Sequence, residues 1–214
     1  MVRLTKSPLP PNVTITSEKD YRTDPVFSLL VNDCHSKCYI CEDKPTTINV
    51  EHIIPHRNDK ALKFNWDNLF LSCGHCNNTK LAKFEDILDP TKCNPEEHIA
   101  LSVNITDQLI DCVEIEALIE DEITIQTVKL LDCIYNEGST CIKKIECANL
   151  RNESLMPTIR LFYQYLQGHQ NEPDLGYGDK IREELKRSSK FAAFKRKIIR
   201  DDPELSAEFA SSLD

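Results

Sequence analysis

The chain has 214 residues, a formal net charge of −9 and ten cysteines. Its length suits one domain or two small ones. The absence of a Gly-rich phosphate loop, with only five glycines in all, excludes an ATPase. No apolar run approaches the roughly 18 residues that a membrane span needs. An acidic chain binds nucleic acid poorly unless it has a local basic surface or a partner protein provides much of the binding. Without an apolar leader segment, ten cysteines favour the reducing cytoplasm as the compartment.

Residues 1–35 are predicted to form an N-terminal arm and a short helix. Three prolines fall within the first eleven residues, and no periodic pattern follows as far as residue 22. An extended arm is therefore expected, which either wraps the body of the chain or docks on a partner. Asp24-Pro25 then opens a helix through about Asp33, with proline at its first turn.

Two Cys-x-x-Cys pairs, Cys38/Cys41 and Cys73/Cys76, mark the next segment, residues 36–84. Two cysteines separated by two residues fit one tight turn, so both sulfurs can face a single ion. Two such turns complete a tetrahedral zinc shell. A single redox-active pair in a βαβ setting is the weaker interpretation. Four thiolates leave no open coordination position, so the zinc is expected to be structural and the chemistry to lie elsewhere.

Between the cysteine pairs lies Glu51-His52, inside a β-branched stretch from Val50 to Ile54 that predicts a short strand. Asn68 precedes a second apolar run and is placed to bond the backbone of the intervening loop. A helix is expected from Asn77 onward, with asparagine as its N-cap. Two strands and a helix that close over an ion make a ββα-metal finger.

The C-terminal region, residues 85–214, is predicted to be rich in helix and to carry one β-hairpin at about 98–116. The stretch 107–122 holds seven acidic residues and no Lys or Arg, so it should point away from DNA or towards a basic partner. Apolar periodicity predicts helices over 124–136 and 156–167. The expected fold class is therefore α+β.

A basic helix is predicted at about 180–200, where nine Lys or Arg residues accompany two acidic ones. One interpretation is a solvated amphipathic helix that packs on the body of the chain. The other is a helix that docks on the DNA backbone or on a protein partner. The acidic tail after residue 200 is expected to fray.

The order Cys-x-x-Cys, Glu-His-Ile-Ile-Pro, Asn, Cys-x-x-Cys-Asn-x-x-Lys resembles the HNH (His-Asn-His) endonuclease family over about fifty residues. By position, the resemblance implies that His52 is the general base that deprotonates the attacking water. It implies that Asn68 orders the loop and orients that base. Glu51 and Asn77 would be the protein ligands of a catalytic divalent cation. Asn77 departs from the family pattern, which has histidine there, and an amide oxygen suits Mg²⁺ or Mn²⁺ better than a transition metal.

The finger also carries candidate phosphate contacts. These are His56, Arg57 and Lys80. Cations around a phosphodiester suit an enzyme that grips the DNA backbone with little sequence preference. For His56, ligation of the cation and a structural role are open alternatives.

The layout of the whole chain is similar to the nuclease subunits of Septu-type bacterial anti-phage systems, some of which occur as retron effectors. The resemblance rests on a finger near the N-terminus, a Lys-Cys-Asn-Pro turn at 92–95 and a helical tail. It implies a partner ATPase of the ABC/SMC type that restrains or directs the nuclease. Two alternatives stay open, a stand-alone restriction or repair nuclease and a non-catalytic zinc module that only binds a partner.

Overall fold

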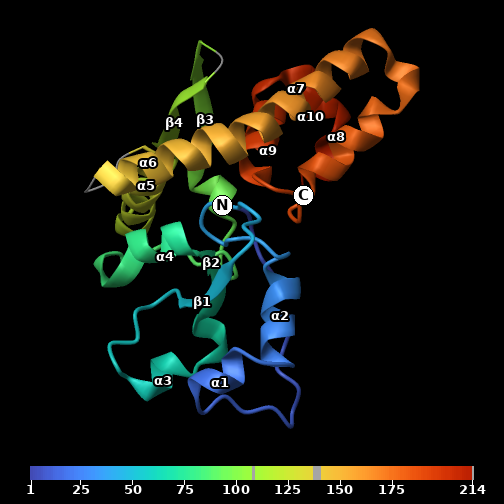
Figure 1. Ribbon diagram of the computed structural model, residues 1–214. Coiled ribbons are helices and arrows are strands. Elements are labelled where there is room, and N and C mark those ends of the chain that lie inside the picture. The colour runs from blue at the N-terminus through green and yellow to red at the C-terminus, as the bar shows by residue number, and fades with distance from the viewer. Residues whose placement is uncertain (108, 137–140, 214) are drawn as a thin grey trace.

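The computed structural model describes residues 1–107, 109–136 and 141–213. Figure 1 shows the arm, the finger and helix α2 below, and the β-hairpin and the C-terminal helices above. Each of the two antiparallel sheets has two strands, β1 with β2 and β3 with β4. The fold is α+β, as predicted.

The N-terminal arm wraps the body of the chain. It carries the short helix α1 (Glu18–Tyr21) and leads into α2 (Val26–Asp33). Trp66 donates its indole N–H to the carbonyl of Ser7 at 2.9 Å, and Ser7 in turn donates to Asp33 at 2.7 Å. These contacts tie the arm to the finger and to α2, which begins and ends where the sequence predicted.

The finger consists of β1 (Ile48–His52), β2 (Leu69–Cys73) and α4 (Gly74–Lys80), with the one-turn helix α3 (Lys60–Lys63) in the loop between the strands. In the register of the sheet, His52 lies opposite Leu69. Helix α4 begins three residues before the predicted start. Its N-cap is Cys73, whose sulfur accepts from the N–H of Cys76 at 3.3 Å, so a zinc-site cysteine replaces the expected asparagine cap.

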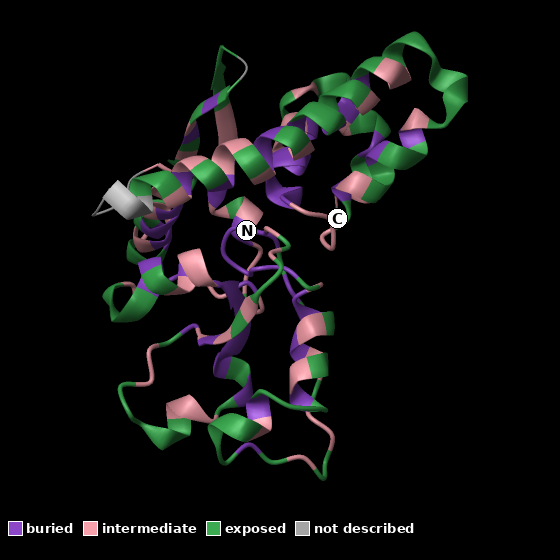
Figure 2. Ribbon diagram, viewed as in Figure 1, coloured by how far each residue is buried: buried purple, intermediate pink, exposed green. Residues whose placement is uncertain are grey.

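The hairpin is formed by β3 (Ile99–Thr106) and β4 (Leu109–Ala117), with an irregularity in register at Asn104/Ile105. Its predicted extent agrees, although Gln108 at the turn lies outside the described residues. Helix α5 (Glu122–Tyr135) packs against β4. Apolar side chains of the arm, finger, hairpin and α5 form one continuous core, which is the buried centre of Figure 2.

The remaining elements are helical. They are α6 (Cys141–Asn149), a π-helical turn (Leu150–Leu155), α7 (Met156–Asn171), α8 (Tyr177–Leu185), α9 (Ala192–Asp201) and α10 (Pro203–Glu208). A second, smaller core lies between α7, α8, α9 and α10. Phe209 is fully buried in it, so the acidic tail folds back and does not fray in the way that the sequence suggested.

The predicted basic helix at 180–200 is instead two helices, α8 and α9, separated by residues 186–191. Phe191, whose φ of 52° is left-handed, marks the break and is fully buried. Lys195 and Arg196 also point inward, with side chains 0% and 1% exposed. Arg196 donates to both carboxylate oxygens of Glu96, at 2.8 and 3.0 Å. The charges of Lys195 and Arg196 are therefore neutralised inside the fold by Glu184 and Glu96.

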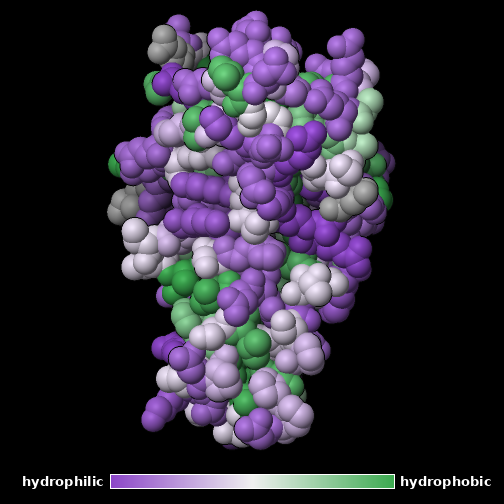
Figure 3. Space-filling model, turned by 90° about the vertical axis from the view of Figure 1, so that its right-hand side faces the viewer, coloured by the Kyte–Doolittle hydropathy of each residue, from purple (hydrophilic) through white to green (hydrophobic). Residues whose placement is uncertain are grey.

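The surface turned toward the viewer in Figure 3 is mainly hydrophilic over the upper, C-terminal half. Hydrophobic residues gather lower down, at the height that α2 has in Figure 1. Among the described residues, no helix has the length and apolar character needed to cross a membrane.

Candidate active site and zinc site

Four buried cysteines form the zinc site. Cys38 and Cys41 meet Cys73 and Cys76 with all four sulfurs within 4.8 Å of one another. The Cys41 and Cys73 sulfurs are 3.9 Å apart. A tetrahedral ion with Zn–S bonds of about 2.3 Å requires a sulfur separation of about 3.8 Å, so the donor set fits Zn²⁺. Four protein ligands would close the shell, which is typical of a structural zinc site.

A separate cavity of about 360 Å³ opens at the end of β1, where Glu51, His52 and Asn77 all border it. His56 and Arg57 also line the cavity. The structure therefore brings together the predicted base, both predicted cation ligands and two of the three candidate phosphate contacts. We call this cavity, a candidate active site, the catalytic pocket.

The imidazole of His52 is held in one orientation by the finger. Its Nε2 lies 2.9 Å from the carbonyl oxygen of Lys63, and a carbonyl can only accept, so Nε2 carries the proton. The neutral ring consequently keeps its lone pair on Nδ1. Desolvation by burial lowers the pKa of His52 below its ordinary value of 6.5, against the opposing effect of the Lys63 carbonyl. The ring is therefore neutral at pH 7 and able to take up a proton.

Asn68 fastens the loop that follows His52. Its Oδ1 accepts from the N–H of Ile54 at 2.8 Å, and its Nδ2 donates to the carbonyl of Ile54 at 2.9 Å. The same Nδ2 donates to the carbonyl of Leu62 at 3.0 Å. The buried amide thus joins the two ends of the loop that presents the imidazole, and it makes no direct contact with the pocket.

Glu51 is buried, and both of its carboxylate oxygens have partners. Lys80 donates to one at 3.0 Å and the Tyr39 hydroxyl donates to the other at 2.9 Å. Burial raises the pKa of Glu51, and these two donors oppose that rise. Each oxygen retains a second lone pair, so a carboxylate here and the amide of Asn77 remain a hard donor set that suits Mg²⁺ or Mn²⁺.

The structure differs from the expectation for Lys80. Its side chain is fully buried, and its ammonium also donates to the carbonyl of His52 at 2.9 Å. A lysine enclosed in this way cannot reach a phosphate in solution, so Lys80 holds the strand that carries Glu51 and His52 and is not a phosphate contact in this arrangement.

The other two candidate contacts lie at the pocket surface. The ring of His56 is 4.7 Å from that of His52, and its Nδ1 accepts from the N–H of Asn58 at 3.0 Å. Arg57 is 64% exposed and forms an ion pair with Glu85. Arg57 is therefore accessible to a phosphate, although a carboxylate already contacts it.

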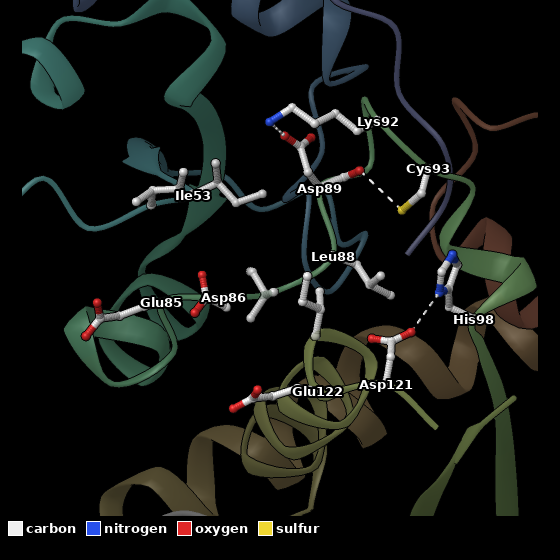
Figure 4. Close-up of a pocket in the computed structure, with 13 residues that line it drawn as sticks. Ile53, Glu85, Asp86, Leu88, Asp89, Lys92, Cys93, His98, Asp121 and Glu122 are labelled. Carbon is white, nitrogen blue, oxygen red and sulfur yellow. Dashed lines mark hydrogen bonds and ion pairs between the residues drawn. The ribbon is translucent and has the colours of Figure 1, made fainter. Parts of the chain in front are cut away.

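A second cavity, of about 630 Å³, lies beyond that ion pair, and we call it the acidic pocket. Figure 4 shows Leu88 near the centre of the pocket, Ile53 to one side, and carboxylates on several sides of Leu88. The carboxylates are those of Glu85, Asp86, Asp89, Asp121 and Glu122. Lys92 and His98 are the basic side chains in its lining, and each is close to one of the carboxylates, at 3.1 Å from Asp89 and 3.8 Å from Asp121. Such a lining repels a polyanion.

Several groups in the site could not be found from the sequence. Tyr39 gave no signal because it lies between the two cysteines of a pair, where only the metal spacing was informative. Glu18, Tyr21 and Arg22 of the arm border the catalytic pocket although they precede the finger in the sequence. Only the tertiary packing of the arm brings them there.

Comparison with known proteins agrees with this geometry. The HNH endonuclease family model matches residues 33–83. The chain is 34% identical over 79 residues to the Septu protein PtuB of Bacillus thuringiensis, a stretch that covers 34% of this chain and 31% of that protein. The alignment thus spans less than a third of the length of this curated relative. No solved structure matches the chain. The likeness predicted from the cysteine, Glu-His and asparagine motifs is confirmed, and residues 33–83 are an HNH endonuclease domain.

Proposed function

We propose that this protein is a metal-dependent HNH endonuclease that hydrolyses phosphodiester bonds in DNA. The observation that carries the proposal is the arrangement of His52. Its proton is fixed on Nε2 by a backbone carbonyl, its pKa is lowered by burial, and it borders the same pocket as the hard donors Glu51 and Asn77. A water molecule beside a phosphodiester in that pocket would meet a neutral base.

The residues act in sequence on the water and the phosphate. His52 takes the proton of the attacking water at Nδ1, while the Lys63 carbonyl stabilises the resulting imidazolium through Nε2. Asn68 keeps the loop, and therefore the ring, in place. Glu51 and Asn77 would hold Mg²⁺ or Mn²⁺, which when bound polarises the phosphate and stabilises charge on the leaving oxygen. Arg57 and His56 would contact the substrate backbone.

We further propose that the chain is the nuclease subunit of an anti-phage defence complex with an ATPase partner of the ABC/SMC type. The likeness to a Septu protein supports this assignment. The charge of the chain does so as well, because a net charge of −9 and an acidic pocket beside the finger disfavour unaided binding to DNA. A cytoplasmic location follows from the same proposal.

The first experiment is plasmid cleavage by the purified chain in Mg²⁺ or Mn²⁺, beside His52→Ala and a control, His98→Ala. Both substitutions remove one imidazole, but His98 borders the acidic pocket. Cleavage lost only with His52→Ala supports the nuclease mechanism. Equal activity in all three proteins would refute the role of His52.

The partner proposal has a separate test. Tagged chain is purified from its native host, and co-purifying proteins are identified by mass spectrometry. A stoichiometric partner with a P-loop, whose addition changes cleavage in the plasmid assay, supports the defence complex. Full activity of the chain alone, with no such partner, would favour the stand-alone nuclease.

A further inference from the structure

One wall of the catalytic pocket comes from outside the HNH domain. The domain match begins at residue 33, whereas Glu18, Tyr21 and Arg22 lie in and just after helix α1 of the arm. All three line the pocket together with His52 and Asn77. Figure 1 shows α1 next to α3 at the lower end of the finger. The arm therefore adds side chains to the site that the finger alone would lack.

Helix α1 is held firmly against the catalytic base. The Tyr21 ring is buried, meets the His52 ring edge to face at 5.9 Å, and packs on Phe64 at 6.4 Å. Glu18 forms an ion pair with Lys63 at 2.7 Å, and the carbonyl of that same Lys63 fixes His52. The position of α1 is thus tied to the loop that orients the base, so residues at its end have a defined place in the pocket lining.

Arg22 supplies the guanidinium group of this wall, and that group is accessible to solvent. Its side chain is 64% exposed, and its ion pair with Glu18 is long, at 3.4 Å, to a carboxylate that Lys63 already holds more closely. Ion pairs at such exposure contribute little free energy, about 0–1 kcal/mol. The planar guanidinium therefore remains able to bind a phosphate with two parallel hydrogen bonds.

The charges around the pocket define where a substrate backbone can run. On one side, Arg57 is paired with Glu85, and the acidic pocket with its five carboxylates lies beyond that pair. A polyanion that leaves the catalytic pocket in that direction would be repelled. Helix α1 and the residue after it add Arg22 to the lining of the catalytic pocket, where its side chain is 64% exposed.

We propose that Arg22 is a substrate-binding residue that holds a phosphodiester group next to the scissile one. The ligand is the backbone of a nucleic acid, and the arm is part of the enzyme's substrate groove. This inference rests on the proposed nuclease function, because it assumes that the catalytic pocket receives a nucleic acid.

The test measures binding without cleavage. His52→Ala protein, with and without Arg22→Ala, is titrated against a fluorescein-labelled 20-base-pair DNA duplex in Mg²⁺, and anisotropy gives Kd between 50 and 200 mM NaCl. Loss of one phosphate contact should reduce the slope of log Kd against log salt by about 1, and weaken binding about tenfold at 0.1 M salt. Arg22→Lys should restore part of the affinity.

The matched control is Lys19→Ala, which removes one positive charge from the same helix at a residue outside the pocket lining. It should leave the salt slope unchanged. Circular dichroism melts confirm that each variant is folded. An Arg22→Ala variant with the same slope and Kd as its parent would overturn the inference and leave the nuclease proposal intact. A parent that binds neither this duplex nor the corresponding single strand, together with a plasmid left intact by the unsubstituted chain even with its partner added, would overturn both.

Discussion

Replacement of Lys80 tests how the site is built. Its burial predicts that the replacement lowers stability, whereas its position in the sequence motif predicted that the replacement weakens phosphate binding. In the structure it is fully buried and shares a 3.0 Å ion pair with Glu51. Replacement by alanine leaves the carboxylate with Tyr39 as its remaining partner. Removal of one member of a buried pair destabilises a protein by about 3–5 kcal/mol. We expect a loss near the lower end, because Glu51 can become protonated when Lys80 is absent.

The assay is thermal unfolding followed by circular dichroism. For a chain of this size, a loss of about 3 kcal/mol lowers Tm by about 6–12 °C. Lys83→Ala is the control, since it removes an exposed lysine three residues further along and should leave Tm nearly unchanged. Adding Glu51→Gln to Lys80→Ala should recover part of the loss, because no charged group is then left buried alone.

The pH dependence of the stability of Lys80→Ala is an independent test of the buried ion pair. Burial raises the pKa of Glu51 above 4.5, and loss of Lys80 should raise it further. A carboxyl whose pKa is higher in the folded state binds protons more tightly there, so stability is lost as pH rises. The deficit of Lys80→Ala should therefore be larger at pH 8 than at pH 5. A variant as stable as Lys83→Ala, with a DNA-binding salt slope reduced by about 1, would show that Lys80 contacts phosphate after all.

Three further results are expected. Removal of zinc by a strong chelator should lower Tm by about 10 °C or more, since the whole finger closes on that site, while Cys93→Ser should keep one zinc per chain by elemental analysis. On the acid side of the pH profile, kcat/KM should fall with a midpoint below pH 6.5. The reason is that burial favours neutral His52, so the rate falls only as pH drops through the lowered pKa of this residue. A midpoint above pH 6.5 would contradict the assignment of His52 as the base. In urea, Arg196→Ala should lose about 3–5 kcal/mol, and Lys186→Ala, whose ion pair is exposed, less than about 1; equal losses would show that the buried pair is unimportant.

The finger could be predicted because its determinants are local. Cysteine spacing, the β-branched strand and the asparagines all act within about forty residues, and the metal requires them to meet. The start of α4 explains why Lys80 is buried. With the helix beginning at Gly74, Cys76 and Lys80 are four residues apart and lie on one face. Because Cys76 points inward to the cysteine cluster, the side chain of Lys80 also points into the interior.

The basic segment was misjudged for a different reason. Ala192, Lys195, Arg196 and Ile199 follow the spacing of one helical face, and all four are buried. A pattern read from hydropathy assigns the two cations to solvent. The partner of Arg196 is distant in the sequence, because Arg196 pairs with Glu96 across 100 residues, whereas Lys195 pairs with Glu184 of the preceding helix. Burial of a cation depends on such a partner, and for Arg196 no local window of the sequence contains it.

The net charge of −9 is unevenly distributed over the folded chain. Carboxylates surround the acidic pocket on one side of Arg57, while the inward Lys195 and Arg196 remove positive charge from the surface. The cations that remain near His52 come from the finger and from the arm, two segments that only the folded chain joins. In the nuclease that we propose, the exposed cations Arg22 and Arg57 beside the pocket are each paired with a carboxylate. Its unaided affinity for DNA should then be low, which is the situation in which a partner that delivers DNA has the largest effect on cleavage.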